Sequence, residues 1–238
     1  MQGFVPVWVI SGLSVAGVIL RPFAVPEWIF AAGGALALVA LGLLPLQLAA
    51  EGVASGADVY LFLAGMMLLA EIARREGLFD YLASFAARHA RGSPTRLFAL
   101  TYGVGVLVTV FLSNDATAVV LTPAVAAVAR AAKAKDAVPY LLVCAFVANA
   151  ASFVLPISNP ANLVIFGGAM PGLADWLARF ALPSLVAVAA TFAALWATQR
   201  RALEGRVESD VAPPRLGRGG RVAAAGLVLA ALVLVTAS

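Results

Sequence analysis

Long apolar stretches separated by short polar connections run the whole length of this chain. Several of them approach the roughly 20 residues that a helix needs to cross the hydrocarbon core of a bilayer. The pattern predicts an all-α membrane protein with about six transmembrane spans, one re-entrant helical hairpin and one broken helix. The apolar stretches are residues 4–20, 28–48, 57–73, 97–112, 116–130, 138–170, 179–198 and 222–237.

Two shorter segments have a mixed character. In residues 78–91, five apolar side chains share one helical face, which predicts an amphipathic helix lying on the membrane surface. Residues 173–178, with Trp176, are interpreted as a short interfacial segment that precedes the span at 179–198. The five apolar residues of the amphipathic segment are Leu78, Phe79, Leu82, Phe85 and Ala86.

The stretches 97–112 and 116–130 are divided by the polar tripeptide Ser113-Asn114-Asp115. The two arms contain about 16 and 15 residues, fewer than a full span requires. Basic residues flank both outer ends, so the segment enters and leaves on the same side of the membrane. We therefore expect a re-entrant hairpin at 94–131 whose tip lies within the membrane. The alternative is two full spans joined by a tight outer turn.

Asp115 is the only charged residue between Arg96 and Arg130. A charged group at this depth costs at least about 2.5–3.5 kcal/mol on insertion scales, so such residues usually face water or a binding partner. We expect Asn114 and Asp115 to bind a solute or an ion at the tip. The alternative is that they only cap the second helical arm.

The stretch 138–170 is too long for one span. A straight helix over this range would extend about 50 Å, against roughly 30 Å of hydrocarbon. Pro156 and Pro160 bracket Ser158-Asn159, and Asn162 follows, so we expect an unwound middle at 156–162. The alternative is a simple proline kink. Two discontinuous helices that meet near the membrane midplane are typical of secondary transporters.

Composition and charge agree with this interpretation. Hydrophobic residues make up 63% of the chain and charged residues 12%, far from the balance of a soluble domain. Of the 16 Lys and Arg residues, only Arg179 falls on the side opposite the others. This bias predicts a multi-pass protein of the inner (cytoplasmic) membrane with its N-terminus outside. The net charge of +4 therefore reflects membrane topology and does not indicate a nucleic-acid partner.

No catalytic pattern accompanies these spans. The single cysteine, Cys144, lies in an apolar run, and the sequence has no metal-ligand spacing, phosphate-binding loop or nucleophile elbow. We expect no enzyme activity, cofactor or metal. Residues 200–221 contain Pro213-Pro214 and Gly219-Gly220 and predict a cytoplasmic linker.

Two stretches resemble a known family. "FLSNDATAVVLTP" (residues 111–123) and "VANAASFVLPISNPANLVIFG" (147–167) resemble the ArsB arsenite/antimonite permeases of the ion transporter superfamily. The resemblance extends over most of the chain. More distantly, Ser113-Asn114-Asp115 resembles the Ser-Asn-Thr hairpin tip of the dicarboxylate carriers, with Asp115 in place of their threonine. Pro160-Ala161-Asn162 resembles the Pro-Pro-Asn stretch of their broken helix.

The resemblance implies export of arsenite and antimonite as uncharged trihydroxides. Antiport against protons, or an associated cytoplasmic ATPase, would drive the export. A carboxylate at the tip suits coupling to protons or sodium, or a neutral hydroxylated solute, better than an anion. The implied binding residues are Ser113, Asn114, Asp115, Thr117, Ser158, Asn159 and Asn162.

Members of the resembled family are about twice as long, because an inverted second repeat follows the first. We therefore expect residues 1–199 to form one N-terminal repeat and residues 222–238 to begin an incomplete second one, with a C-terminal half chain as partner. Other interpretations remain open: half of a sodium/proton antiporter or organic-anion carrier, a non-transporting membrane subunit that docks a cytoplasmic ATPase, or an inactive product.

Overall fold

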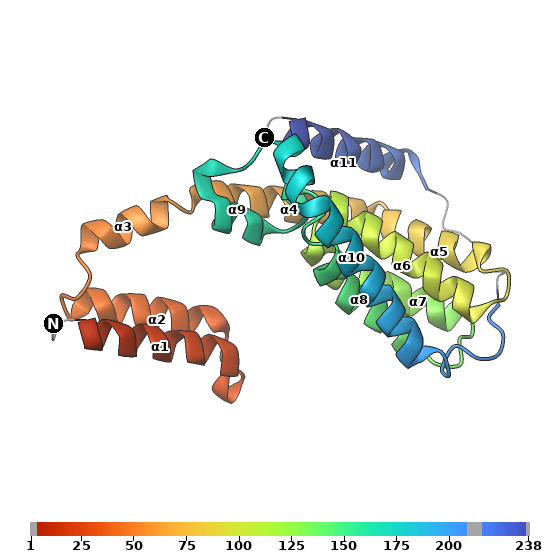
Figure 1. Cartoon of the computed structure of the whole chain (residues 1–238), viewed down its shortest axis with the longest axis horizontal. Helices are drawn as coiled ribbons and strands as arrows, with labels where there is room; N and C mark the ends of the chain where they lie inside the picture. The colour runs from red at the N-terminus through yellow and green to blue at the C-terminus, as the bar shows by residue number, and fades with distance from the viewer. Residues whose placement is uncertain (1–3, 209–215, 237–238) are drawn as a thin grey trace. The chain divides into compact units, whose positions relative to one another are not determined.

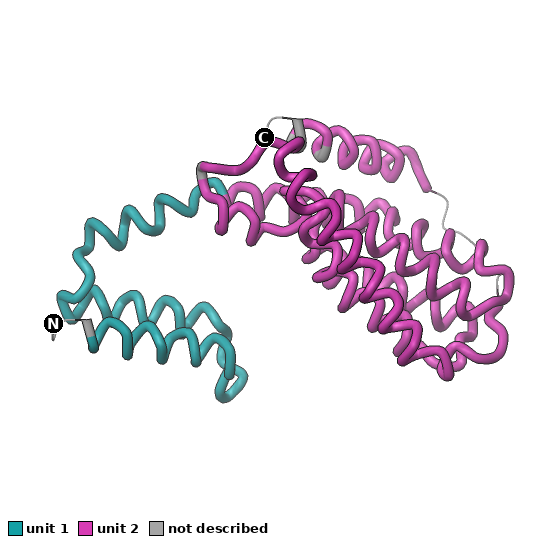
Figure 2. The backbone as a smooth tube through the Cα atoms, viewed as in Figure 1, with its two compact units in different colours: residues 1–58 teal, residues 59–238 magenta. Residues whose placement is uncertain are grey.

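The computed structural model describes residues 4–208 and 216–236, and all regular elements in these ranges are helical. Three helical stretches are long and apolar enough to cross a membrane: Leu46–Arg75, Pro94–Phe111 and Leu173–Gln199. The prediction of an all-α membrane protein is confirmed, while the total of about six spans stays a prediction. The chain forms two compact units, residues 1–58 and 59–238 (Figure 2).

The first unit is built on a helical hairpin. Helix α1 (Phe4–Leu20) and helix α2 (Glu27–Ala40) pack side by side (Figure 1). A Cβ atom on Gly34 would lie 1.8 Å from the hydroxyl oxygen of Ser14, so glycine is what permits this close approach. Helix α3 (Leu46–Ala54) completes the unit.

The predicted helix at 28–48 is wrong in its C-terminal part. Helix α2 ends at Ala40, and the chain turns before α3 begins at Leu46. Gly42 adopts a positive φ of 68°, which stops a right-handed helix, and Pro45 precedes the first residue of α3. These two residues, both visible in the sequence, explain the division.

The second unit contains a cluster of four helices at its centre. They are α5 (Leu78–His89), α6 (Pro94–Phe111), α7 (Thr122–Ala131) and α8 (Val138–Ala150). Helices α5 and α8 each contact both α6 and α7 (Figure 1). Gly105 allows α6 to lie against α8, because a Cβ there would sit 2.6 Å from Cγ1 of Val147.

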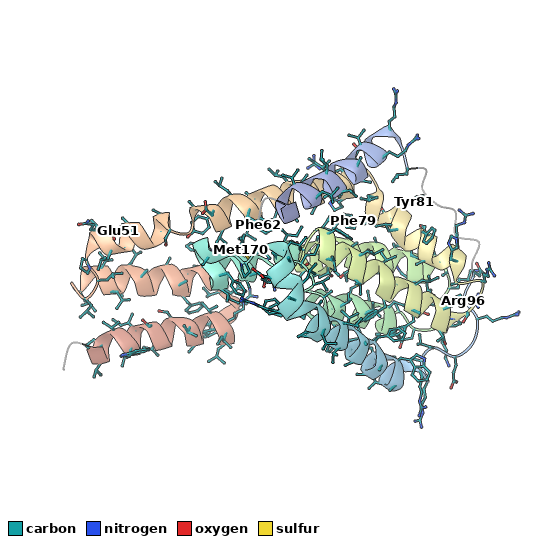
Figure 3. The ribbon with its side chains drawn as sticks, turned by 45° about the horizontal axis from the view of Figure 1, so that its top comes forward. Glu51, Phe62, Phe79, Tyr81, Arg96 and Met170 are labelled. Carbon is teal, nitrogen blue, oxygen red and sulfur yellow. The ribbon has the colours of Figure 1, made fainter. Side chains whose placement is uncertain are left out.

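Helix α5 differs in part from the predicted surface helix. It packs on α6 and α7 and buries Leu78, Phe79 and Ala83, whereas Phe85 is 43% exposed. Figure 3 labels Phe79 on this helix. The buried face is thus rotated from the predicted one toward the small residues, because alanine lets neighbouring helices approach closely.

The predicted interfacial segment 173–178 and the span 179–198 form one helix, α10 (Leu173–Gln199). Trp176 is fully buried and does not stand at an interface. Its Nε1 donates a hydrogen bond to the carbonyl oxygen of Phe153 at 3.1 Å, and its ring packs on Phe166 and Phe180. No helix-breaking residue lies between Leu173 and Phe180, so the helix continues through the proposed boundary.

The predicted linker at 200–221 is only partly a linker. In residues 200–208, Leu203 and Val207 are buried, and Val207 N–H donates to the carbonyl of Gly92. Helix α11 (Arg218–Thr236) starts four residues before the predicted span at 222. Residues 209–215 and 237–238 lie outside the described residues.

Candidate functional site

The hairpin tip is organised by Ser113. Helix α6 ends at Phe111, and Ser113 has a φ of 154°, which interrupts the helix. The Ser113 hydroxyl accepts a hydrogen bond from Ala116 N at 3.3 Å, and its carbonyl accepts one from Thr117 N at 3.3 Å. Ser113 therefore caps the second arm, which was the alternative role considered for Asn114 and Asp115.

Asp115 is left free by this arrangement. Its carboxylate is exposed and makes no hydrogen bond or ion pair with any residue in the described ranges. The neighbouring Asn114 Oδ1 accepts a hydrogen bond from Asp115 N at 3.0 Å, which fixes the backbone at the tip. The two polar neighbours thus hold the backbone, while the carboxylate is available to a ligand.

The second arm begins with a π-helical turn, η2 (Ala116–Leu121), instead of the regular helix predicted for 116–130. The Thr122 N–H bonds to the carbonyl of Thr117, five residues earlier. Pro123 explains the wider turn, because in a regular helix its ring would clash with the carbonyl of Val119. Such turns are frequent at functional sites, and Pro123 was a signal for it in the sequence.

Thr117 connects the turn to α6. It is fully buried, and its hydroxyl lies 2.8 Å from the hydroxyl of Thr109. The Thr122 hydroxyl donates to the Thr117 carbonyl at 3.1 Å. The predicted binding residue Thr117 therefore braces the two arms against each other.

The predicted break in the 138–170 stretch is present but begins earlier than expected. Helix α8 ends at Ala150, a short 3₁₀ turn η3 covers Pro156–Ser158, and helix α9 covers Pro160–Phe166. The unwound segment is thus 151–159 and not 156–162. Pro160 begins α9 because proline suits the first helical position, and Asn159 caps it by accepting from Ala161 N at 2.9 Å.

Two further polar side chains stabilise this break. Ser158 Oγ donates a hydrogen bond to the carbonyl of Val110 at 3.0 Å. This carbonyl belongs to the last turn of α6, where carbonyl groups have no partner within the helix. Asn162 Nδ2 donates to the carbonyls of Ser152 and Pro156 at 3.3 and 3.0 Å. Both side chains are fully buried and bind the backbone of the protein itself. Asn162 Oδ1 has no hydrogen-bond partner in the described part of the chain.

A cavity of about 580 Å³ lies between the tip and helix α4 (Ala57–Arg75). This volume suits a small solute. Its walls are mainly apolar, with polar groups from Ser113, Asp115 and Glu71. Of the seven predicted binding residues, only Ser113 and Asp115 line it. The lining residues are Leu63, Ala64, Met66, Met67, Leu68, Ala70, Glu71, Ser113, Asp115, Ala116, Val119, Val120 and Pro160.

Glu71 is a cavity residue that the sequence reasoning did not select. Its carboxylate pairs with Arg74 and Arg75 of the same helix, both at 2.7 Å. A carboxylate inside the apolar stretch 57–73 was the available signal, since acidic groups are rare in spans. In the sequence, Arg74 and Arg75 follow Glu71 closely, and this spacing is typical of an ion pair on the surface of a helix end.

The structure therefore brings together the tip and the start of α9, because Ser113, Asp115 and Pro160 line the same cavity. It also joins the unwound segment to the end of α6 through Ser158 and Val110. Within the described ranges, no group of three or more His, Cys, Asp or Glu side chains gathers in a way that could hold a metal ion.

Comparison with known proteins identifies the family. Residues 8–238 match the family described as CitMHS, citrate transporter. This chain belongs to the citrate transporter family. The match extends over both units and includes the tip and the unwound segment.

Several curated relatives of this citrate transporter family member are named as transporters. An uncharacterised transporter of Mycobacterium tuberculosis is 30% identical over 45% of the chain and 25% of its own length. An uncharacterised transporter of Synechocystis is 26% identical over 85% of the chain and 45% of its own length. The chain thus spans less than half the length of these relatives.

A third relative supports the wider superfamily. The putative arsenical pump membrane protein of Bacillus subtilis is 30% identical over 60% of the chain and 33% of its own length. This similarity supports the ion transporter superfamily, but it does not assign the chain to the ArsB permeases in particular. No solved structure matches the chain.

Proposed function

We propose that this chain forms the N-terminal half of a secondary transporter of the cytoplasmic membrane, with a small solute bound beside Asp115. The observation that carries the proposal is the free carboxylate of Asp115 in a cavity of about 580 Å³. A charged group without a protein partner in mainly apolar surroundings is costly unless it faces water, an ion or a solute. Membership of a transporter family agrees with this reading.

The favoured solute is the uncharged trihydroxide of trivalent arsenic or antimony. A neutral hydroxylated solute can donate hydrogen bonds to the Asp115 carboxylate and the Ser113 hydroxyl, and because it has no charge the carboxylate of Asp115 does not repel it. The arsenical pump name of the Bacillus relative supports this choice. Proton or sodium uptake by Asp115 would couple the solute movement to the ion gradient, since each charge that crosses gains about 2.3 kcal/mol per 100 mV.

An organic-anion carrier is the second candidate. The description of the family as citrate transporters favours it. The free carboxylate of Asp115 weighs against a bare polycarboxylate, because like charges repel each other, whereas the charge of Glu71 is already balanced by Arg74 and Arg75. The two candidates therefore differ in a measurable way, by the solute that the vesicles accumulate.

Transport into everted membrane vesicles tests the proposal. The chain is expressed alone and together with a complementary C-terminal half, and uptake of arsenite and of citrate is measured with an imposed proton or sodium gradient. We expect gradient-dependent arsenite uptake that Asp115→Asn lowers at least tenfold. Asp136→Asn, outside the cavity, is the matched control and should transport normally. Full transport by the Asp115→Asn variant would refute the coupling role, and uptake of citrate alone would replace the favoured solute by the second candidate.

A further inference from the structure

Three polar segments that are far apart in the sequence meet at one end of the second unit. They are residues 88–96, 130–136 and 200–208. Val207 N–H donates to the Gly92 carbonyl at 3.2 Å, and Glu208 N–H donates to the Ala132 carbonyl at 2.7 Å. Lys133 Nζ pairs with Glu208 Oε1 at 2.6 Å. We refer to these three segments together as the basic rim; Figure 3 labels Arg96 within it.

The basic rim carries a large excess of positive charge. Each segment contributes three Lys or Arg residues, and all of these side chains are exposed. The acidic residues of the rim are Asp136, Glu204 and Glu208. Glu208 is held by Lys133, and Asp136 accepts a hydrogen bond from Val138 N at 2.9 Å. Among the described residues, the other basic side chains of the rim have no ion-pair partner, so the rim can attract anions.

Exposed apolar side chains lie directly beside the basic rim. Trp196, 42% exposed, lies one helical turn before Arg200 on α10. Phe85, 43% exposed, lies one turn before His89 on α5, and Val138, 50% exposed, follows the middle segment. Aromatic residues collect where the hydrocarbon meets the headgroups, and basic residues beside them reach lipid phosphates.

We propose that the basic rim binds the headgroups of anionic phospholipids, and that residues 204–208 fasten the three segments into one binding surface. A soluble acidic partner would not need exposed aromatic side chains directly behind the cations, whereas a lipid headgroup and its acyl chain contact both. The bound lipid bridges the loop before α6, the loop after α7 and the end of α10. It therefore holds both ends of the hairpin against α10.

Native mass spectrometry of the full chain in a neutral detergent tests this surface. The protein is titrated with phosphatidylglycerol and separately with phosphatidylcholine, and the occupancy of bound lipid is measured. We expect selective retention of phosphatidylglycerol. Since each basic residue near an anionic surface contributes about fivefold to affinity, the double variant Arg200→Gln/Arg201→Gln should bind phosphatidylglycerol at least tenfold more weakly.

Two control variants separate charge from folding. Arg179→Gln removes a cation from α10, the helix that leads to Arg200, about 30 Å from the rim at 1.5 Å per residue, and should leave binding unchanged. Arg200→Lys/Arg201→Lys keeps the charge and should retain binding. Equal retention of the two lipids, equal loss in Arg179→Gln, or loss in the lysine variant would overturn the proposal, as would retention of full phosphatidylglycerol binding by the glutamine variant.

Discussion

At the scale of single residues, the polar side chains of the second unit divide into those that serve the backbone and those that remain free. Ser113, Asn159 and Asn162 satisfy backbone groups at chain reversals. Asp115 does not, and it faces the cavity. Any unwound segment inside a membrane needs such internal partners, because lipid offers none. Of the seven predicted residues, Ser113, Asn159 and Asn162 thus serve the backbone, whereas solute binding by Asp115 stays a prediction.

Asn162 provides a test of the backbone-serving group. Replacing it by alanine leaves the carbonyls of Ser152 and Pro156 without their donor in a fully buried place, so we expect a loss of about 2–4 kcal/mol in unfolding free energy. The exposed Asn149, which donates only to Ala145 within its own helix, is the matched control, and Asn149→Ala should lose less than about 1 kcal/mol. Reversible unfolding in mixed micelles measures both. Equal stability of the two variants would show that Asn162 does not hold the break.

At the scale of elements, helix ends and helix contacts are set by a few small or cyclic residues. Gly42 with Pro45 divides the second predicted span, Pro123 widens the start of the second arm, and Pro160 begins α9. The approach of α6 to α8 depends on Gly105 and Val147. Each effect follows from steric constraints on one residue, so a substitution at that residue can test it.

Gly105 and Gly103 make a matched pair on α6. A methyl group at 105 would lie 2.6 Å from Cγ1 of the buried, rigid Val147, so Gly105→Ala should destabilise by about 1–3 kcal/mol. At Gly103 nothing lies within 4 Å of the added Cβ, so Gly103→Ala should be neutral or stabilising by up to about 1 kcal/mol. Thermal unfolding in detergent measures both shifts.

Removing the side-chain conflict should rescue the first variant. In Gly105→Ala/Val147→Ala the added methyl group takes the place of Cγ1, one of the two methyl groups that Val147 loses, and the α6–α8 distance need not change. The double variant should therefore be more stable than Val147→Ala and Gly105→Ala would predict by addition. Strict additivity would contradict the close contact.

The helices and their approximate ends could be predicted from the sequence, but the residues against which each helix packs could not. Apolar stretches and prolines are local signals, and they located α6, α8 and the break to within a few residues. Trp176 looked interfacial because an aromatic residue near a helix start usually is; its burial depends on Phe153 and Phe166, which the sequence does not place beside it. For the same reason the sequence could mark Glu71 as an unusual carboxylate in an apolar stretch, but it could not place Glu71 on the same cavity as Asp115.

At the scale of the whole molecule, basic segments that the charge bias assigns to one side of the membrane also lie together at one end of the second unit. The basic rim joins three segments that the charge bias assigns to one side of the membrane. Arg179 lies near the other end of α10. The hairpin ends and the C-terminal end of α10 are thus expected on the cytoplasmic face.

Cysteine labelling in intact cells checks this orientation. In a Cys144→Ala background, Thr95→Cys, Ala131→Cys and Glu204→Cys should resist a membrane-impermeant maleimide until the cells are opened. Ala174→Cys, at the opposite end of α10 and exposed, should react from outside. Outside labelling at 95 or 131 would contradict the assigned face.

Labelling also distinguishes the re-entrant hairpin from two full spans. If the tip lies at membrane depth, Asp115→Cys should react slowly with the impermeant reagent from either side, and faster with a small permeant one. A rate equal to that of Ala174→Cys from outside would place the tip at an outer turn.

The wide turn at Ala116–Leu121 has one more consequence. A π turn accommodates one residue more than an α-helix between the same two ends. A chain shortened by one residue between Asp115 and Thr122 can therefore join the same ends with ordinary helical geometry. Deletion of a single amino acid here should be tolerated far better than deletion at any other point of the arm, and alignments of the family should show a one-position gap at this place.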